Sequence, residues 1–129
     1  MKKILMSLIL LFAVSIMINS QELLIAKIES SAKGGVKKFT LSKSQQGIYK
    51  KIIIKYIQNE VKFGMIRLFF NNESEVNKKG GQGSLMINKE NSVIEFDVEN
   101  ENILAKLTFY FSNSRNEEKN CIFEVYGVK

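Results

Sequence analysis

Three carboxylates lie at alternate positions in and just after a strand-like segment. Glu95, Asp97 and Glu99 are spaced i, i+2, i+4, and a strand would place all three on one face. Carboxylate oxygens are ligands that Ca²⁺ prefers, so the spacing predicts a candidate calcium site, although a solvated strand face has the same pattern. Two carboxylates also suffice for glycoside hydrolysis, so a small carboxylate-dependent hydrolase is one alternative function.

A second group of residues combines positive charge with aromatic rings. Its members, which we take as candidate ligand-binding residues, are Tyr49, Lys50, Lys51, Lys55 and Tyr56. Tyrosine rings stack on sugars, and lysine ammonium groups hold anions. The competing interpretation is a core element whose lysine stems cover apolar surface.

The counts of histidine and cysteine exclude much chemistry. The chain has no histidine and one cysteine, which excludes Ser-His-Asp and Cys-His catalysis and metal sites that need histidine or several thiolates. We therefore expect no cofactor and no enzymatic activity. Cys121 lies in a strand-like segment, 121–126, and is either a buried thiol or the link of a disulfide-bonded homodimer.

The positive charge is concentrated in the first half of the chain. The formal net charge is +6, and residues 22–65 hold nine lysines against three glutamates. Such a balance favours an anionic glycan, an envelope surface or an extracellular protein as partner. No arginine-rich recognition element is present, so we expect no nucleic acid partner.

The first twenty residues have the pattern of a secretory signal peptide. Lys2 and Lys3 precede an apolar run from Ile4 to Ile18, and Ser20 offers a small residue for cleavage. An uncleaved anchor is the alternative. We predict a signal peptide over 1–20 and a single β-rich domain over 21–129, without a transmembrane segment. The protein would be secreted, or periplasmic in a Gram-negative bacterium. Asn72 begins an Asn-Glu-Ser glycosylation sequon, relevant only in a eukaryote.

Short apolar runs separated by turn residues predict an all-β fold. Eight segments have strand character: 23–29, 36–41, 48–57, 61–70, 84–88, 92–98, 103–111 and 121–126. We predict an antiparallel β-sandwich of seven or eight strands, with a loop over 71–83. Alternation along the later segments places six residues in the core: Phe96, Leu107, Phe109, Phe111, Phe123 and Val125.

One segment carries a competing signal. Apolar residues between 48 and 57 recur at helical spacing, and Ser42 with Gln45 has the spacing of a capping box. The alternative fold is therefore α+β, with a helix at about 42–58 packed on an antiparallel sheet. The predicted function is a secreted, non-enzymatic binding or adhesion module for a surface glycan, an envelope component or a protein. An inhibitor-like or chaperone-like α+β module acting on a protein partner is the alternative.

Overall fold

The computed structural model describes residues 21–31, 35–79, 85–112 and 120–129, and the predicted signal peptide lies outside these ranges. The described residues contain nine strands and no helix. The strands are β1 (Glu22–Ser31), β2 (Gly35–Thr40), β3 (Lys51–Gln58), β4 (Val61–Phe70), β5 (Glu75–Lys79), β6 (Met86–Ile87), β7 (Val93–Asp97), β8 (Leu104–Phe111) and β9 (Asn120–Val128). Within these ranges, no helix is long and apolar enough to cross a membrane.

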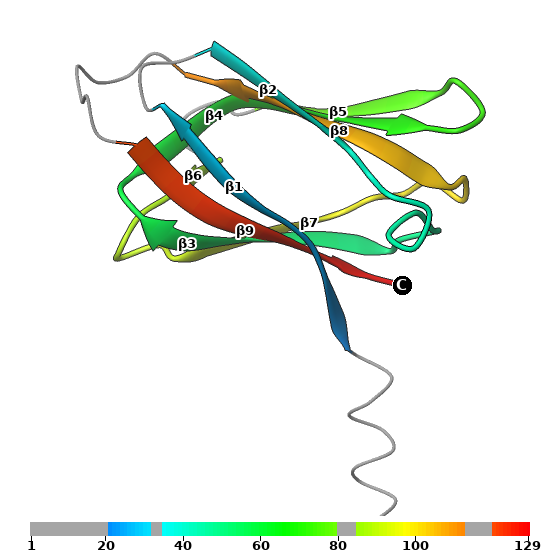
Figure 1. Cartoon of the computed structure of the whole chain (residues 1–129), viewed down its shortest axis with the longest axis horizontal. Coiled ribbons are helices and arrows are strands. Elements are labelled where there is room, and N and C mark those ends of the chain that lie inside the picture. The colour runs from blue at the N-terminus through cyan, green and yellow to red at the C-terminus, as the bar shows by residue number, and fades with distance from the viewer. Residues whose placement is uncertain (1–20, 32–34, 80–84, 113–119) are drawn as a thin grey trace, which may run out of the picture.

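The strands form two antiparallel sheets packed face to face, which confirms the predicted sandwich (Figure 1). One sheet has four strands in the order β1-β9-β3-β7. The other has the order β2-β8-β4-β5, with the short β6 also paired to β4. Neighbouring strands are often distant in sequence, so the outer surface of each sheet combines residues from several parts of the chain.

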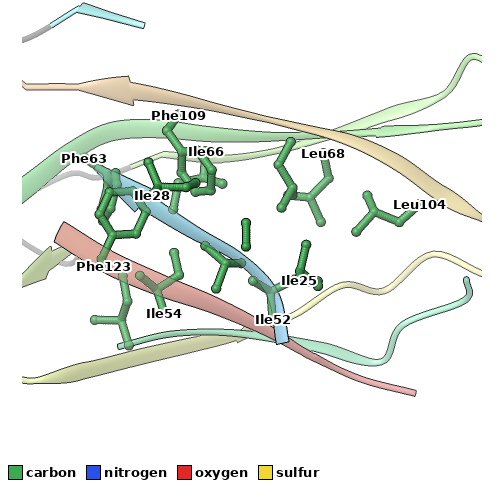
Figure 2. Packing of buried hydrophobic residues seen from close by; sticks show 14 of the residues in the cluster. Ile25, Ile28, Ile52, Ile54, Phe63, Ile66, Leu68, Leu104, Phe109 and Phe123 are labelled. Carbon is green, nitrogen blue, oxygen red and sulfur yellow. The ribbon is translucent and has the colours of Figure 1, made fainter. Parts of the chain in front are cut away.

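Aromatic side chains fill one end of the core (Figure 2). The ring of Phe123 lies 5.2 Å from that of Phe63 and 5.4 Å from that of Phe109, with edge-to-face geometry in both pairs. Such pairs contribute beyond their buried area. Five of the six predicted core residues are buried, whereas Phe96 is only partly buried and packs against the margin of the core. It lies on β7, an edge strand, which has a neighbour on one side only.

The alternative helix over 42–58 is wrong. Ser42 and Gln45 do make capping contacts, since the Ser42 backbone N–H donates to Gln45 Oε1 at 3.0 Å, but only a single turn forms there. The chain then continues as β3, in which Ile52 and Ile54 are fully buried in the core. β-Branched side chains favour an extended strand. Burial of Ile52 and Ile54 on one face of β3 stabilises the strand, although the apolar residues of this segment have helical spacing.

The predicted loop over 71–83 is also wrong in part, because it contains β5. A tight turn follows β4, with Glu73 at a φ of 70°, and returns the chain alongside β4. Asn72 lies exposed in this turn and accepts a hydrogen bond from the Ser74 hydroxyl at 2.6 Å. The strand was missed because Val76 is its only apolar residue.

The alternation predicted for 103–111 changes phase at Ala105. Residues Leu107, Phe109 and Phe111 point into the core as expected, but Leu104 is fully buried and Ile103 is 36% exposed. The cause is an irregularity in the register, in which Phe69 pairs with Lys106 and Phe70 with Leu104. One extra residue in β8 reverses the side-chain direction beyond it.

Candidate functional site

The outer face of the four-stranded sheet brings together residues from both ends of the chain. In one row across the strands, Val128 on β9 pairs with Glu22 on β1 and with Lys51 on β3, and Lys51 pairs with Asp97 on β7. In the next row, Tyr126 and Ile53 are neighbours. These side chains point outward because residues at the alternating positions of β9, such as Phe123 and Val125, are fully buried in the core.

A cleft of about 410 Å³ lies on this face. We call it the outer cleft, and it is lined by Glu22, Lys50, Lys51, Ile53, Glu95, Asp97, Val128 and Lys129. Its apolar lining comes from Val128 and from Ile53, which is only 5% exposed although it points away from the core. Long charged side chains on the neighbouring strands therefore cover an apolar floor.

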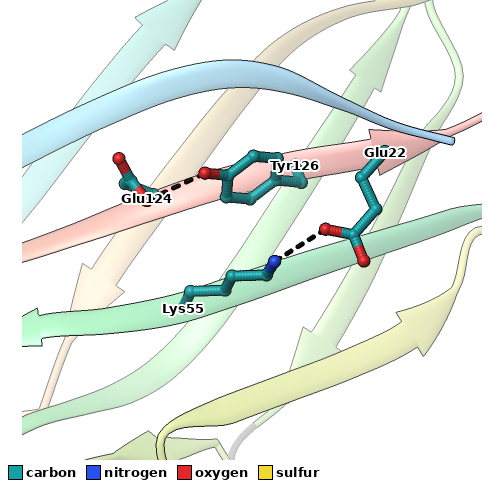
Figure 3. Close-up of polar contacts among 4 residues, drawn as sticks. All are labelled: Glu22, Lys55, Glu124 and Tyr126. Atoms are coloured by element: carbon teal, nitrogen blue, oxygen red, sulfur yellow. Dashed lines mark hydrogen bonds and ion pairs between the residues drawn. The ribbon is translucent and has the colours of Figure 1, made fainter.

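Ion pairs organise the rim of the outer cleft. Lys51 Nζ lies 3.4 Å from Glu95 Oε1, which joins β3 to β7. Lys55 Nζ lies 2.7 Å from Glu22 Oε1 and 4.5 Å from the centre of the Tyr126 ring. The Tyr126 hydroxyl donates to Glu124 Oε1 at 2.9 Å (Figure 3). Four residues from three strands thus form one connected group of polar contacts beside the cleft.

The protonation of this group follows from its hydrogen bonds. The pKa of Lys55 is raised, chiefly by its hydrogen bond to Glu22. The pKa of Tyr126 is raised, chiefly by its hydrogen bond to Glu124. Both groups therefore hold their protons more firmly than isolated side chains do, so near neutral pH Lys55 carries its charge and Tyr126 remains a hydrogen-bond donor.

The predicted lysine and tyrosine group is divided by the structure. Lys50 and Lys51 line the outer cleft, and Lys55 lies beside it. Tyr49 is only 1% exposed, and its hydroxyl donates to the Gln45 carbonyl oxygen, so its ring is not available to stack on a sugar. Burial also raises the pKa of Tyr49.

Tyr56 is likewise unavailable as an open aromatic surface. It is partly buried against the core, and its hydroxyl accepts the Asn59 backbone N–H at 3.1 Å. Strand alternation explains the division. Lys51, Ile53 and Lys55 share the outer face of β3, whereas Tyr56 shares the inner face with Ile52 and Ile54.

The structure does not bring the three carboxylates of the predicted calcium site together on one strand face. Glu95 and Asp97 lie on the outer face of β7, but the strand ends at Asp97 and Glu99 has a φ of 55°. The chain turns there, so the three carboxylates do not share one strand face. Among the described residues, no group of three acidic, histidine or cysteine side chains is arranged to hold a metal ion.

Cys121 lies on the inner face of β9 and is fully buried. A disulfide to a second copy would require this side chain to leave the core. Sequence reasoning did not find Glu22, Ile53, Tyr126 or Val128 as parts of the site. No local motif marks them, and only the register of β1, β9 and β3 brings them together.

Comparisons with known proteins give similarity in shape only. No family model matches the chain, and no curated protein matches it in sequence. The structure of the infectious bursal disease virus Gx strain is 11% identical, with a TM-score of 0.42, over 83% of this chain and 30% of that chain. This chain thus spans less than a third of the length of the viral chain it matches.

Two smaller proteins match over nearly their whole length. The family 32 CBM from C. perfringens NanJ, solved in complex with galactose, is 9% identical with a TM-score of 0.39, over 77% of this chain and 99% of that chain. The Drosophila NLP core is 13% identical with a TM-score of 0.35, over 81% and 96%. At these scores no site or activity transfers to this chain.

Proposed function

We propose that this protein is an exported binding module without enzymatic activity, which holds a neutral glycan chain in the outer cleft. The observation that carries the proposal is the balance of charge around an apolar floor. Three lysines and three carboxylates line the cleft: Lys50, Lys51, Lys129, Glu22, Glu95 and Asp97. A ligand with a single strong charge gains little net attraction from such a rim.

A sugar chain matches this arrangement because its hydroxyl groups both donate and accept hydrogen bonds. Ammonium groups supply donors only, and carboxylates supply acceptors only, so the rim offers both to the same ring. The side chain of Val128, with the small exposed part of Ile53, provides apolar surface for the C–H face of the sugar. Binding sites commonly combine an apolar floor with a few polar groups that fix orientation.

The site of action proposed is outside the cytoplasm. Support comes from Lys2, Lys3 and the apolar run that follows them, which have the composition of an export signal. A glycan at a cell surface or in an envelope would be reached from that compartment.

Binding is a better match than hydrolysis for the carboxylates of the cleft. A general acid in glycoside cleavage is a carboxylic acid whose surroundings keep it protonated. The side chain of Glu95 is instead 54% exposed and pairs with Lys51. The proposed role for Glu95 and Asp97 is therefore to accept hydrogen bonds from the ligand.

Calorimetry with a panel of neutral oligosaccharides tests the proposal. Asp97→Asn removes a charge from the cleft, and Glu90→Gln removes a charge from an exposed residue elsewhere. We expect Asp97→Asn to weaken binding about tenfold and Glu90→Gln to leave it unchanged. Equal effects, or no binding by any neutral glycan, would refute the cleft as a glycan site. Release of new reducing ends that Glu95→Gln abolishes would establish the hydrolase instead.

A further inference from the structure

The outer face of the five-stranded sheet has a different chemistry from the outer cleft. One row of paired residues crosses four strands: Lys38 on β2, Thr108 on β8, Arg67 on β4 and Asn77 on β5. These side chains point outward, since Leu107 and the other core residues of β8 occupy the alternating positions. We call this surface the arginine face.

Arg67 is held in place at the centre of the arginine face. Its Nε donates to Asn77 Oδ1 at 2.9 Å. Its guanidinium carbon lies 5.4 Å from the centre of the Tyr110 ring and 5.8 Å from that of Phe69. Lys106 Nζ lies 4.5 Å from the same Phe69 ring. Two cationic groups are thus positioned over aromatic rings, which orders them before any ligand arrives.

Positive charge exceeds negative charge on this surface. Arg67 and Lys106 are joined by Lys38 and Lys79, which are exposed on the two outer strands of the sheet. Facing them is Glu75, whose carboxylate lies 3.9 Å from Arg67 Nε and is 43% exposed. Among the described residues, this is the one ion pair recorded for the four cations. An anion approaching the arginine face therefore meets uncompensated positive charge.

A buried hydroxyl lies in the same row. Thr108 is 1% exposed, and its Oγ1 has no hydrogen-bond partner among the described residues. Buried polar groups are nearly always hydrogen-bonded. Because Thr108 is the direct neighbour of Arg67 and Lys38, a small shift of their side chains would bring its O–H to an anion held between them.

We propose that the arginine face binds an anionic glycan through its sulfate or carboxylate groups. Arginine is suited to these groups because its planar guanidinium makes paired hydrogen bonds to two oxygens. The lysines add charge, and the partly exposed rings of Tyr110 and Phe69 add apolar contact with the sugar. A glycan fits better than a membrane because Val36 is the one large apolar side chain strongly exposed on these strands. This site is independent of the outer cleft, so either can fail alone.

Two binding measurements test the proposal, one with dextran sulfate and one with unsulfated dextran. The protein is expressed from its full-length gene and purified in the processed form that the cell yields. We expect binding to dextran sulfate with an affinity that falls as salt increases, whereas any binding of unsulfated dextran in the outer cleft should not change in variants of the arginine face. The double variant Arg67→Gln/Lys106→Gln should weaken this binding at least tenfold. The matched control Lys50→Gln/Lys51→Gln removes the same charge from the outer cleft and should change it less than twofold.

A second variant and a second ligand keep the test decisive. Lys38→Gln/Lys79→Gln alters only exposed side chains, so it should fold normally and still lose binding severalfold. If the control Lys50→Gln/Lys51→Gln loses as much dextran sulfate binding, the effect depends on net charge alone and the proposal is overturned. Absence of dextran sulfate binding at low salt would also overturn it. Anionic phospholipid vesicles that bind as tightly as dextran sulfate, and lose binding in the same variants, would reassign the face to membranes.

Discussion

The two outer faces of the sandwich arrange their charges in opposite ways. On the four-stranded sheet, Lys51 contacts a carboxylate on the neighbouring strand β7, and Lys55 reaches past β9 to a carboxylate on β1. On the five-stranded sheet, Arg67 and Lys106 lie over aromatic rings, and cations outnumber the single facing carboxylate. Strand alternation fixes which side chains face outward, whereas cross-strand register decides whether their charges cancel or accumulate.

The largest expected effect is a loss of stability that impairs both outer faces together. Phe123 packs edge-to-face against Phe63 and Phe109 between the two sheets. Phe123→Ala leaves a cavity there and should lower the free energy of unfolding by about 3–5 kcal/mol, measured by urea denaturation. Binding at both faces should fall in parallel with the folded fraction. A loss below about 1 kcal/mol, or loss at one face only, would show that the sheets do not depend on this shared core.

A smaller change should separate the faces. Gly127 lies on β9 beneath the ring of Tyr49, and a Cβ at this position would overlap ring atoms. Gly127→Ala should therefore lower the unfolding free energy by about 1–3 kcal/mol. Because Val128 and Lys129 follow directly, we expect weaker ligand binding in the outer cleft and unchanged dextran sulfate binding.

The matched control for that change is Gly64→Ala. A Cβ at Gly64 meets only the Tyr110 carbonyl oxygen at 3.6 Å, an ordinary contact. Its effect on stability should stay within about 0.5 kcal/mol. If both alanine variants change the unfolding free energy equally, the close approach of Gly127 to Tyr49 does not explain the effect of Gly127→Ala.

The sandwich could be predicted from the sequence because its signals are local. Alternating apolar residues in segments such as 92–98 and 121–126 indicate one buried face directly. β5 gave no such signal, since Val76 is its only apolar residue and pairing with β4 creates the strand. The spacing around Ile52 is a local signal for a helix, but burial of one face of β3 in the core decides the conformation.

The composition of the two outer faces was harder to predict because it depends on register. The lysines of 50–55 were identified, but their partners Glu22 and Glu95 lie far away in sequence. Tyr49 was a candidate for stacking on a sugar, with a core position as the competing interpretation, and its burial follows from a close approach to Gly127 on β9. Neither Arg67 nor Lys106 stands in a basic cluster in the sequence, so pairing of β4 with β8 is what places them together.

A single hydroxyl should reveal a conflict between stability and binding on the arginine face. Thr108→Val replaces the unpartnered Oγ1 with a methyl group and should raise the unfolding free energy by up to about 1 kcal/mol. The same change should weaken dextran sulfate binding two- to threefold if the hydroxyl donates to the anion. Thr40→Val, at an exposed position on β2, should change neither quantity. A destabilised Thr108→Val would mean that the hydroxyl has a partner in the folded protein.

The smallest effect concerns alkaline pH and the four-stranded sheet. The pKa values of Lys55 and Tyr126 are both raised, by hydrogen bonds to Glu22 and Glu124 respectively. A group that holds its proton more tightly when folded stabilises the fold below its unfolded pKa, and this stabilisation is lost as pH rises through the folded pKa. The loss should begin near pH 10, where tyrosine and then lysine ordinarily titrate.

Both groups are partly exposed to solvent, so the effect should be small, as for surface ion pairs in general. Denaturation midpoints measured between pH 8 and 11.5 should fall less steeply in Glu22→Gln, which removes the hydrogen-bond partner of Lys55. Glu75→Gln, on the arginine face, should retain the wild-type slope. If the two variants have the same slope, the Lys55–Glu22 contact does not set the alkaline stability, and the cancellation of charge that distinguishes this face has no thermodynamic consequence.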